Sequence, residues 1–191
     1  MPYEQSSDRS NLKAKKFMIW LIVTTSFMLF AALGSVFIIA VAQSPSGKIG
    51  VQLPLTFAVS TLVIIVSSYT LHLAGRAGMA LAFKKQKQLL SATIILGIVF
   101  FVLQLEAWNQ LIHANVLFKN LNSPQTFIYV LTGAHLLHIL IGLILLGYTL
   151  AGRIGNKANV RVNLRMDVSA IFWHFLDGLW VFLYLFMLIY Q

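Results

Sequence analysis

Cysteine is absent from this chain of 191 residues, and acidic residues are scarce. Without cysteine the protein forms no disulfide, holds no thiolate-bound metal and performs no thiol catalysis. Only 10% of the residues are charged, whereas soluble domains carry ~25%. Together with the 59% share of hydrophobic residues, this shortage of charge indicates an integral membrane protein.

Five apolar stretches are each long enough to cross a bilayer, which takes about 20 residues of helix. They cover residues 17–42, 51–73, 89–113, 126–151 and 168–190. Residues 1–16 mix acidic and basic groups and are expected to form a short cytoplasmic tail without regular structure. The connections are too short for a soluble domain, so the sequence predicts one all-α domain over residues 17–191, a bundle of five transmembrane helices. The first stretch is longer than the apolar region of a cleaved signal peptide.

The net charge of +9 is a topology signal, and we expect no nucleic-acid partner. Lys48 and Lys119 lie in the loops after the first and third stretches. The other twelve basic residues lie in the tail and in the two opposite loops: Arg9, Lys13, Lys15, Lys16, Arg76, Lys84, Lys85, Lys87, Arg153, Lys157, Arg161 and Arg165. Because cytoplasmic loops collect Lys and Arg, the pattern predicts a cytoplasmic N-terminus and an external C-terminus. We expect the membrane to be the bacterial cytoplasmic membrane.

Two ionisable side chains share one depth in the third and fourth stretches. At 1.5 Å per residue, Glu106 lies ~10 Å and His135 ~14 Å from the outer ends of their helices. A carboxyl–imidazole contact between them is therefore sterically feasible. Such contacts contribute only ~0.6–2 kcal/mol, so we expect this one to fasten two helices, with a proton relay as the alternative.

His135 and His138 form an HxxH pair on one helix face. Two histidines so placed can ligate a metal or a haem. A complete site needs further ligands, and the sequence offers neither cysteine nor an HExxH motif beside them. Packing or lipid contact is the favoured interpretation.

The last stretch contains FWHFLDGLWVFLY at residues 172–184, which places two ionisable groups among bulky aromatics. A charge at bilayer depth costs at least ~2.5–3.5 kcal/mol, so such groups find partners inside the protein. His174 and Asp177 are three residues apart and share a helix face. Their partner is expected to be each other, another helix or another subunit, and burial can also keep the Asp177 carboxyl neutral.

Three polar strings occur in one order: LQLEAW at 103–108, TGAHLLHILIG at 132–142 and FWHFLDGLWVFLY at 172–184. Their order and spacing closely resemble subunit III of the haem–copper terminal oxidases, over nearly the whole chain. The resemblance implies the shorter five-helix form of a fold that has seven helices in full-length members. In those members the first two helices form one arm of a lipid-filled cleft.

The resemblance also implies roles for single residues. It matches His135, His138, His174, Asp177, Trp180 and, less closely, Glu106. His138 is expected to contact bound phospholipid, and Arg153 to meet a lipid phosphate. Ser26 stands where many members carry an acidic residue, so no role of that carboxyl is carried over. The family's subunit III holds neither haem nor copper, and the redox centres lie in partner subunits.

The resemblance therefore predicts a non-catalytic subunit of a proton-pumping oxidase that reduces oxygen to water, with subunits I and II as partners. It would support subunit I and its proton uptake. Another small subunit or another respiratory complex is a further candidate partner, over the groove left by the two missing helices. Cytochrome c is favoured over quinol as the electron donor, and a nitric oxide reductase complex is a further alternative. Rival interpretations are a self-contained transporter or proton channel, and a cytochrome b-like haem protein using His135.

Overall fold

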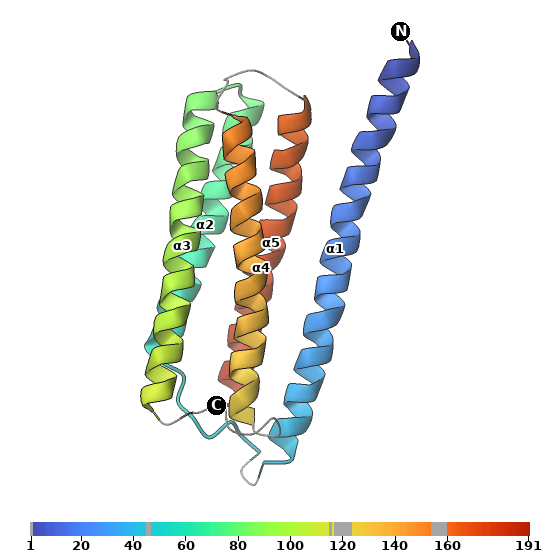
Figure 1. The fold of residues 1–191 in the computed structure, drawn as a ribbon. Helices are drawn as coiled ribbons and strands as arrows, with labels where there is room; N and C mark the ends of the chain where they lie inside the picture. The colour runs from blue at the N-terminus through green and yellow to red at the C-terminus, as the bar shows by residue number, and fades with distance from the viewer. Residues whose placement is uncertain (1, 45–46, 115, 117–123, 154–159) are drawn as a thin grey trace.

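A computed structural model describes residues 2–44, 47–114, 116, 124–153 and 160–191. This part of the chain forms five long helices: α1 (Pro2–Ala42), α2 (Leu55–Met79), α3 (Phe83–His113), α4 (Pro124–Gly152) and α5 (Val160–Ile189). All five are long and apolar enough to cross a membrane, which confirms the predicted all-α membrane fold. Successive helices run in opposite directions, so the two termini lie at opposite ends of the molecule (Figure 1).

Helices α2 to α5 form a bundle, and α1 lies along one side of it (Figure 1). Helix α1 packs on α4 and α5. Most of its buried positions are separated by three, four or seven residues, the spacing of a helix that presents one narrow seam: Ile19, Val23, Ser26, Phe30, Phe37, Ala40 and Val41. Most other large hydrophobic side chains between residues 17 and 39 are exposed, as expected for a surface that faces lipid or another protein.

Helices α2 and α3 form a closely packed hairpin around the turn at residues 80–82. Leu81 in this turn has a φ of 57°, an uncommon backbone conformation for a residue other than glycine. The buried positions of α3 also recur every three or four residues: Gln86, Leu90, Thr93, Gly97, Phe100, Gln104, Ala107 and Leu111. Several of these side chains are small or polar, which lets the backbones approach and supplies hydrogen bonds across the interface.

Each helix extends beyond its predicted apolar stretch at one end or both; α1 and α3 end where predicted, and α2 begins later, at Leu55. The prediction of a tail without regular structure was wrong, because α1 is helical from Pro2. The segment contains Glu, Gln, Leu, Lys and Ala, which favour helix, and it continues a formed helix without a new nucleation cost. Helix α2 follows Pro54 and α4 begins at Pro124, consistent with the tolerance for proline in a first turn. Lys119 and Lys157, which contributed to the topology prediction, lie outside the described residues.

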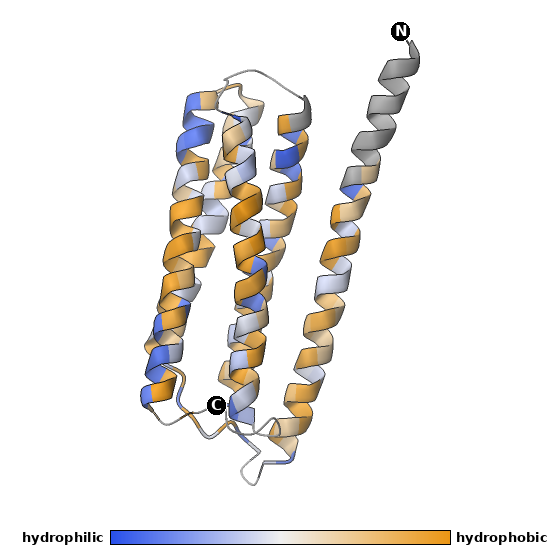
Figure 2. Ribbon diagram, viewed as in Figure 1, coloured by the Kyte–Doolittle hydropathy of each residue, from blue (hydrophilic) through white to orange (hydrophobic). Residues whose placement is uncertain are grey.

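Hydropathy varies along the helices. Figure 2 shows hydrophobic residues through the middle of the helices and hydrophilic residues at both ends of α3 and near the start of α5. The fully buried core includes Trp173 and Trp180 of α5, Phe57 of α2 and Phe100 of α3.

Candidate functional site

His138 connects α4 to α1. Its Nδ1 lies 2.8 Å from the carbonyl oxygen of Ala134, which can only accept, so Nδ1 carries a proton. In the neutral ring Nε2 is then the acceptor, and the Ser26 hydroxyl donates to it at 3.3 Å. Phe30, one turn further along α1, meets the His138 ring edge-on at 5.3 Å between centroids. The half-buried imidazole therefore helps to hold α1 against the bundle.

His135 is fully buried inside a cage of aromatic rings. The ring centroids of Trp180, Phe100 and Phe30 lie 5.1, 5.9 and 6.3 Å from its own. Neither ring nitrogen has a hydrogen-bond partner among the described residues. The imidazole is therefore enclosed by side chains of α1, α3 and α5.

The predicted contact between Glu106 and His135 is wrong. Glu106 is exposed, and its carboxylate accepts a hydrogen bond from the Gln110 side chain at 3.3 Å. The buried polar residue in this part of α3 is Gln104, which donates to the Ser60 hydroxyl at 2.9 Å. Two residues turn a helix by about 200°, so Glu106 points away from the interior that Gln104 faces. Glu106 and His135 were predicted to lie at similar depths in the membrane, but the Glu106 side chain points away from the interior in which His135 is buried.

The structure does not pair His174 with Asp177 either. His174 Nδ1 lies 2.7 Å from the Ser68 hydroxyl of α2. Asp177 is 5% exposed, and neither of its oxygens has a partner that meets hydrogen-bond geometry in the described chain. The Ser68 hydroxyl, which is hydrogen-bonded to His174, also lies near the Asp177 carboxyl and can donate to it while it accepts from His174. Both residues therefore turn toward α2, as their shared face predicted, without bonding to each other.

Trp180 is the centre of the aromatic core. Its indole nitrogen donates to the Thr61 hydroxyl at 3.0 Å. Its ring stacks on Phe57 at 5.9 Å and meets Phe100 at 5.1 Å, in addition to the contact with His135. One side chain of α5 thus contacts α2, α3 and α4.

Sequence reasoning missed several interhelical hydrogen bonds of the same kind. Trp173 donates to the Ser67 hydroxyl at 3.2 Å, and Trp108 donates to the Thr132 hydroxyl at 3.0 Å. The hydroxyls of Thr149 and Ser169 lie 2.8 Å apart. The available signal was the frequency of Ser, Thr and Trp within apolar stretches, which marks interhelical contacts in membranes. That signal does not identify the partners.

Arg153 lies just beyond the end of α4 and is 2% exposed. Its Nη2 donates to the Asn163 side-chain oxygen, and its guanidinium lies over the Phe83 ring at 5.2 Å. Burial lowers the pKa of this guanidinium from its ordinary value, but arginine stays protonated at neutral pH. Nε and Nη1 have no hydrogen-bond partner within the described residues.

A cavity of about 330 Å³ lies beside Arg153. Gly75, Gly78, Gln86 and Asp167 contribute to its lining. The Gln86 side-chain oxygen is buried and also lacks a partner in the described part of the chain. Asp167 is paired with Lys16 of α1 at 2.8 Å. Arg153 and Gln86 therefore both line the cavity, and each carries buried polar atoms without a partner in the described residues.

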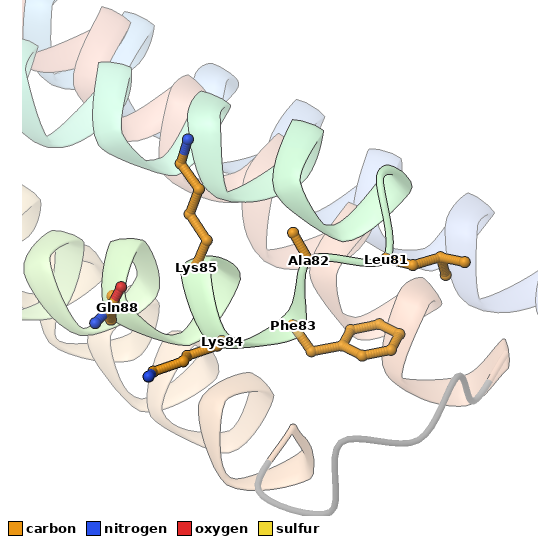
Figure 3. A pocket seen from close by; sticks show the side chains of 6 residues that line it. All are labelled: Leu81, Ala82, Phe83, Lys84, Lys85 and Gln88. Atoms are coloured by element: carbon orange, nitrogen blue, oxygen red, sulfur yellow. The ribbon is translucent and has the colours of Figure 1, made fainter.

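A second, open hollow of about 780 Å³ lies at the α2–α3 turn. It is lined by Leu81, Ala82, Phe83, Lys84, Lys85 and Gln88. In Figure 3 the side chains of Lys84, Lys85 and Phe83 point in different directions. Because its cations do not converge, this hollow lacks the arrangement of a built anion site.

The arrangement as a whole is suited to fastening helices. Across the described residues no group of three or more His, Asp or Glu side chains is placed to hold a metal ion. The polar groups instead join neighbouring helices in pairs: Ser26 with His138, Ser60 with Gln104, Ser68 with His174 and Thr61 with Trp180.

Comparison with known proteins gives consistent matches. Residues 9–191 match the family described as cytochrome c oxidase subunit III. Subunit 3 of the cytochrome bo(3) ubiquinol oxidase of Pseudomonas aeruginosa is 30% identical over 174 residues, or 86% of this chain and 79% of that protein. Cytochrome c oxidase subunit 3 of Bacillus sp. (strain PS3) is 26% identical over 90% of this chain and 84% of that protein. A probable quinol oxidase subunit 3 of Staphylococcus saprophyticus is 27% identical over 95% of this chain and 90% of that protein.

Proposed function

Because this chain belongs to the cytochrome c oxidase subunit III family, we propose that it serves a proton-pumping haem–copper oxidase as a subunit without a redox centre of its own. Its role is to stabilise the subunit that carries the haems and copper and to sustain proton uptake there. The observation that carries this proposal is the use of polar side chains within the bundle. They join helices in pairs, and His135 is enclosed by aromatic rings.

Relatives of both donor classes, cytochrome c and quinol, match this chain. That is expected of a subunit that takes no part in binding the electron donor. The proposal therefore concerns the common part of these enzymes, the membrane complex that reduces oxygen. We place the chain in a bacterial cytoplasmic membrane with its N-terminus inside, which the distribution of basic residues supports.

The proposed function is tested by the number of turnovers that the oxidase completes before it loses activity. The complex is purified with and without this chain, and oxygen consumption and proton release are followed over successive turnovers. The proposal expects the same haem spectrum and similar initial oxygen consumption in both, with faster loss of activity when the chain is missing. Loss of the haem spectrum on removing the chain, with the other subunits retained, would contradict it.

Phospholipid binding is the second part of the proposal. Arg153 supports it, because a buried guanidinium with two unused N–H groups beside a cavity is suited to phosphate oxygens. His138 lies at the edge of the seam between α1 and α4, next to apolar surface that acyl chains can cover. The exposed apolar face of α1 is the surface we assign to lipid or to a further protein.

Replacing Arg153 with Gln tests the lipid site. We expect the purified complex to retain less phospholipid, because the phosphate loses a charge-assisted hydrogen bond worth ~1.5–3 kcal/mol. Lys85→Gln is the matched control, since Lys85 is an exposed cation beside the α2–α3 turn. Native mass spectrometry counts the bound lipids, and equal loss in the two variants would show that only net charge matters.

A further inference from the structure

We propose that Asp177 is a proton-binding site inside the membrane, which exchanges its proton with the cytoplasmic side of the protein through Ser68 and His174. The ligand is a single proton, held by a buried carboxyl group. The inference concerns this chain alone. It rests on the proposed function only for the statement that the end of the bundle at which α1 begins is the cytoplasmic one.

Asp177 lies near the middle of the membrane and is closed off from the surface of the protein. It is 15 residues from the start and 12 from the end of the span Val162–Ile189, or ~22 and ~18 Å along the helix. Both carboxyl oxygens are buried, and neither has a partner that meets hydrogen-bond geometry in the described chain. Because the oxygens are buried, a side chain from outside the chain does not reach them.

No cation of this chain is available at the depth of Asp177. The sequence carries neither lysine nor arginine in the following ranges, which include the middle of every span: 17–47, 49–75, 88–118, 120–152 and 166–191. A carboxylate buried without a cation is so costly that the group takes up a proton instead. The Asp177 carboxyl therefore holds a proton in its resting state.

A string of polar side chains leads from Asp177 toward the cytoplasmic end of the bundle. The Ser68 hydroxyl of α2 lies near the Asp177 carboxyl, and His174 Nδ1 lies 2.7 Å from the same hydroxyl. His72, one turn further along α2, is exposed and interacts electrostatically with His174. It is seven residues from the end of the span Leu55–Met79, or ~10 Å. The string therefore runs from mid-membrane to an exposed imidazole toward the headgroup region, where polar side chains are common.

The string can form its hydrogen bonds in both protonation states of Asp177. When the carboxyl is neutral, its O–H donates to the Ser68 oxygen and the Ser68 hydroxyl donates to His174 Nδ1. When the carboxyl is ionised, His174 Nδ1–H donates to Ser68 and Ser68 donates to the carboxylate. Serine suits the central place, because its hydroxyl both donates and accepts and rotates freely between the two arrangements.

Release of the proton reverses each hydrogen bond in the string. The Asp177 proton passes to the Ser68 oxygen while the Ser68 hydroxyl proton passes to His174 Nδ1. The ring, which already carries a proton on Nε2, becomes an imidazolium and then loses the Nε2 proton to water or to His72. A carboxylate and a neutral imidazole remain, and one proton has left the site. Uptake follows the same steps in the opposite direction.

The two histidines of α4 do not form such a string. His138 Nδ1 is bonded to the carbonyl oxygen of Ala134, which only accepts and does not pass a proton on. His135 has no hydrogen-bond partner for either ring nitrogen among the described residues. Asp177 differs from both because a hydroxyl with an exchangeable proton lies between it and a half-buried imidazole.

Infrared spectroscopy of the purified full chain tests the protonated carboxyl. The chain has only five acidic residues, and the C=O stretch of a neutral carboxyl is resolved from that of an ionised one. At neutral pH we expect a neutral-carboxyl band that disappears in Asp177→Asn. The band should persist in the control Glu106→Gln, because Glu106 is exposed. Absence of the band from the parent, or its survival in Asp177→Asn, would overturn the proton site. Circular dichroism establishes that the helices of each variant are formed.

Transfer of the chain into D₂O tests the route, because the band shifts when deuterium replaces the Asp177 proton. We expect Ser68→Ala to slow this shift by about a hundredfold, the lower end of what a positioned proton-transfer group contributes. Ser68→Thr, which keeps the hydroxyl, should exchange as the parent does. Ser67→Ala is the matched control, since the Ser67 hydroxyl accepts from Trp173 and should exchange no more slowly than the parent.

Exchange in Ser68→Ala at the parent rate or faster would overturn the route through Ser68. Slowing of the same size in Ser67→Ala would also overturn it, because loss of any hydroxyl of α2 would then have the same effect. Both measurements use the chain alone. Failure of the chain to co-purify with a haem-carrying subunit would therefore refute the proposed function and leave the proton site standing.

Discussion

At the scale of single residues, Trp180 contacts three of the other helices in the bundle. It belongs to α5, donates to Thr61 of α2 and contacts Phe100 of α3 and His135 of α4. Van der Waals packing and interhelical hydrogen bonds are the main forces between membrane helices, because lipid tails are as apolar as the side chains. A side chain that supplies both to three neighbours should matter more for stability than most others.

We expect Trp180→Phe to destabilise the protein, because it removes the hydrogen bond to Thr61 and part of the ring contact with His135. The expected loss is about 1–3 kcal/mol, the sum of one hydrogen bond and a small cavity. Trp20→Phe is the control, since Trp20 is 58% exposed on α1. Thermal unfolding of the purified complex measures both, and equal melting temperatures would contradict the role given to Trp180.

Sequence patterns predicted the important polar residues better than their partners. His174 and Asp177 do share a face toward α2, as their spacing indicated, but Ser68 takes the hydrogen bond expected between them. Glu106 and His135 were matched by depth alone. The missing information was rotation about the helix axis, because α3 turns Gln104 inward and Glu106 outward. That rotation is set by packing of the whole helix, which a single pair of residues does not reveal.

At the scale of helices, α1 is held against the bundle by a narrow seam of buried side chains. It packs only on α4 and α5 among the described helices. Ser26 supplies a polar contact at the middle of this seam, to His138. A neutral hydroxyl therefore performs the fastening at this point of the seam.

A double-mutant cycle measures this contact. Ser26→Ala and His138→Phe are made singly and together, and we expect a coupling free energy of ~0.6–2 kcal/mol. Ser35→Ala is the control, because the Ser35 hydroxyl donates to Ala31 of its own helix at 2.9 Å. Additive effects of the two substitutions on unfolding would show that Ser26 and His138 do not interact.

Helix ends were less predictable than helix centres. Apolar composition identifies the part of a helix that lies in hydrocarbon, whereas the helix itself continues where residues favour it and no proline intervenes. Helix α1 accordingly begins at Pro2 and α3 at Phe83, ahead of their apolar stretches. The five spans were predictable because each must satisfy its own backbone in lipid.

At the scale of the whole molecule, the basic residues predict its orientation. Gln43 follows α1 and Gln88 lies in the first turns of α3, at opposite ends of the bundle, and both are exposed. Cysteines placed there are the only thiols in each variant. We expect an impermeant maleimide to label Gln43→Cys from outside and Gln88→Cys only after the inner face is opened. The opposite pattern would refute the orientation.

The central claim is that this chain is a subunit of a haem–copper oxidase and holds no haem itself. The most direct test is purification of the tagged chain in mild detergent, with subunits identified by mass and haems by visible spectrum. We predict stoichiometric recovery of a large haem-carrying subunit, and no Soret band on the chain once it is separated. A Soret band that stays with the isolated chain, at one haem per chain, would contradict the account.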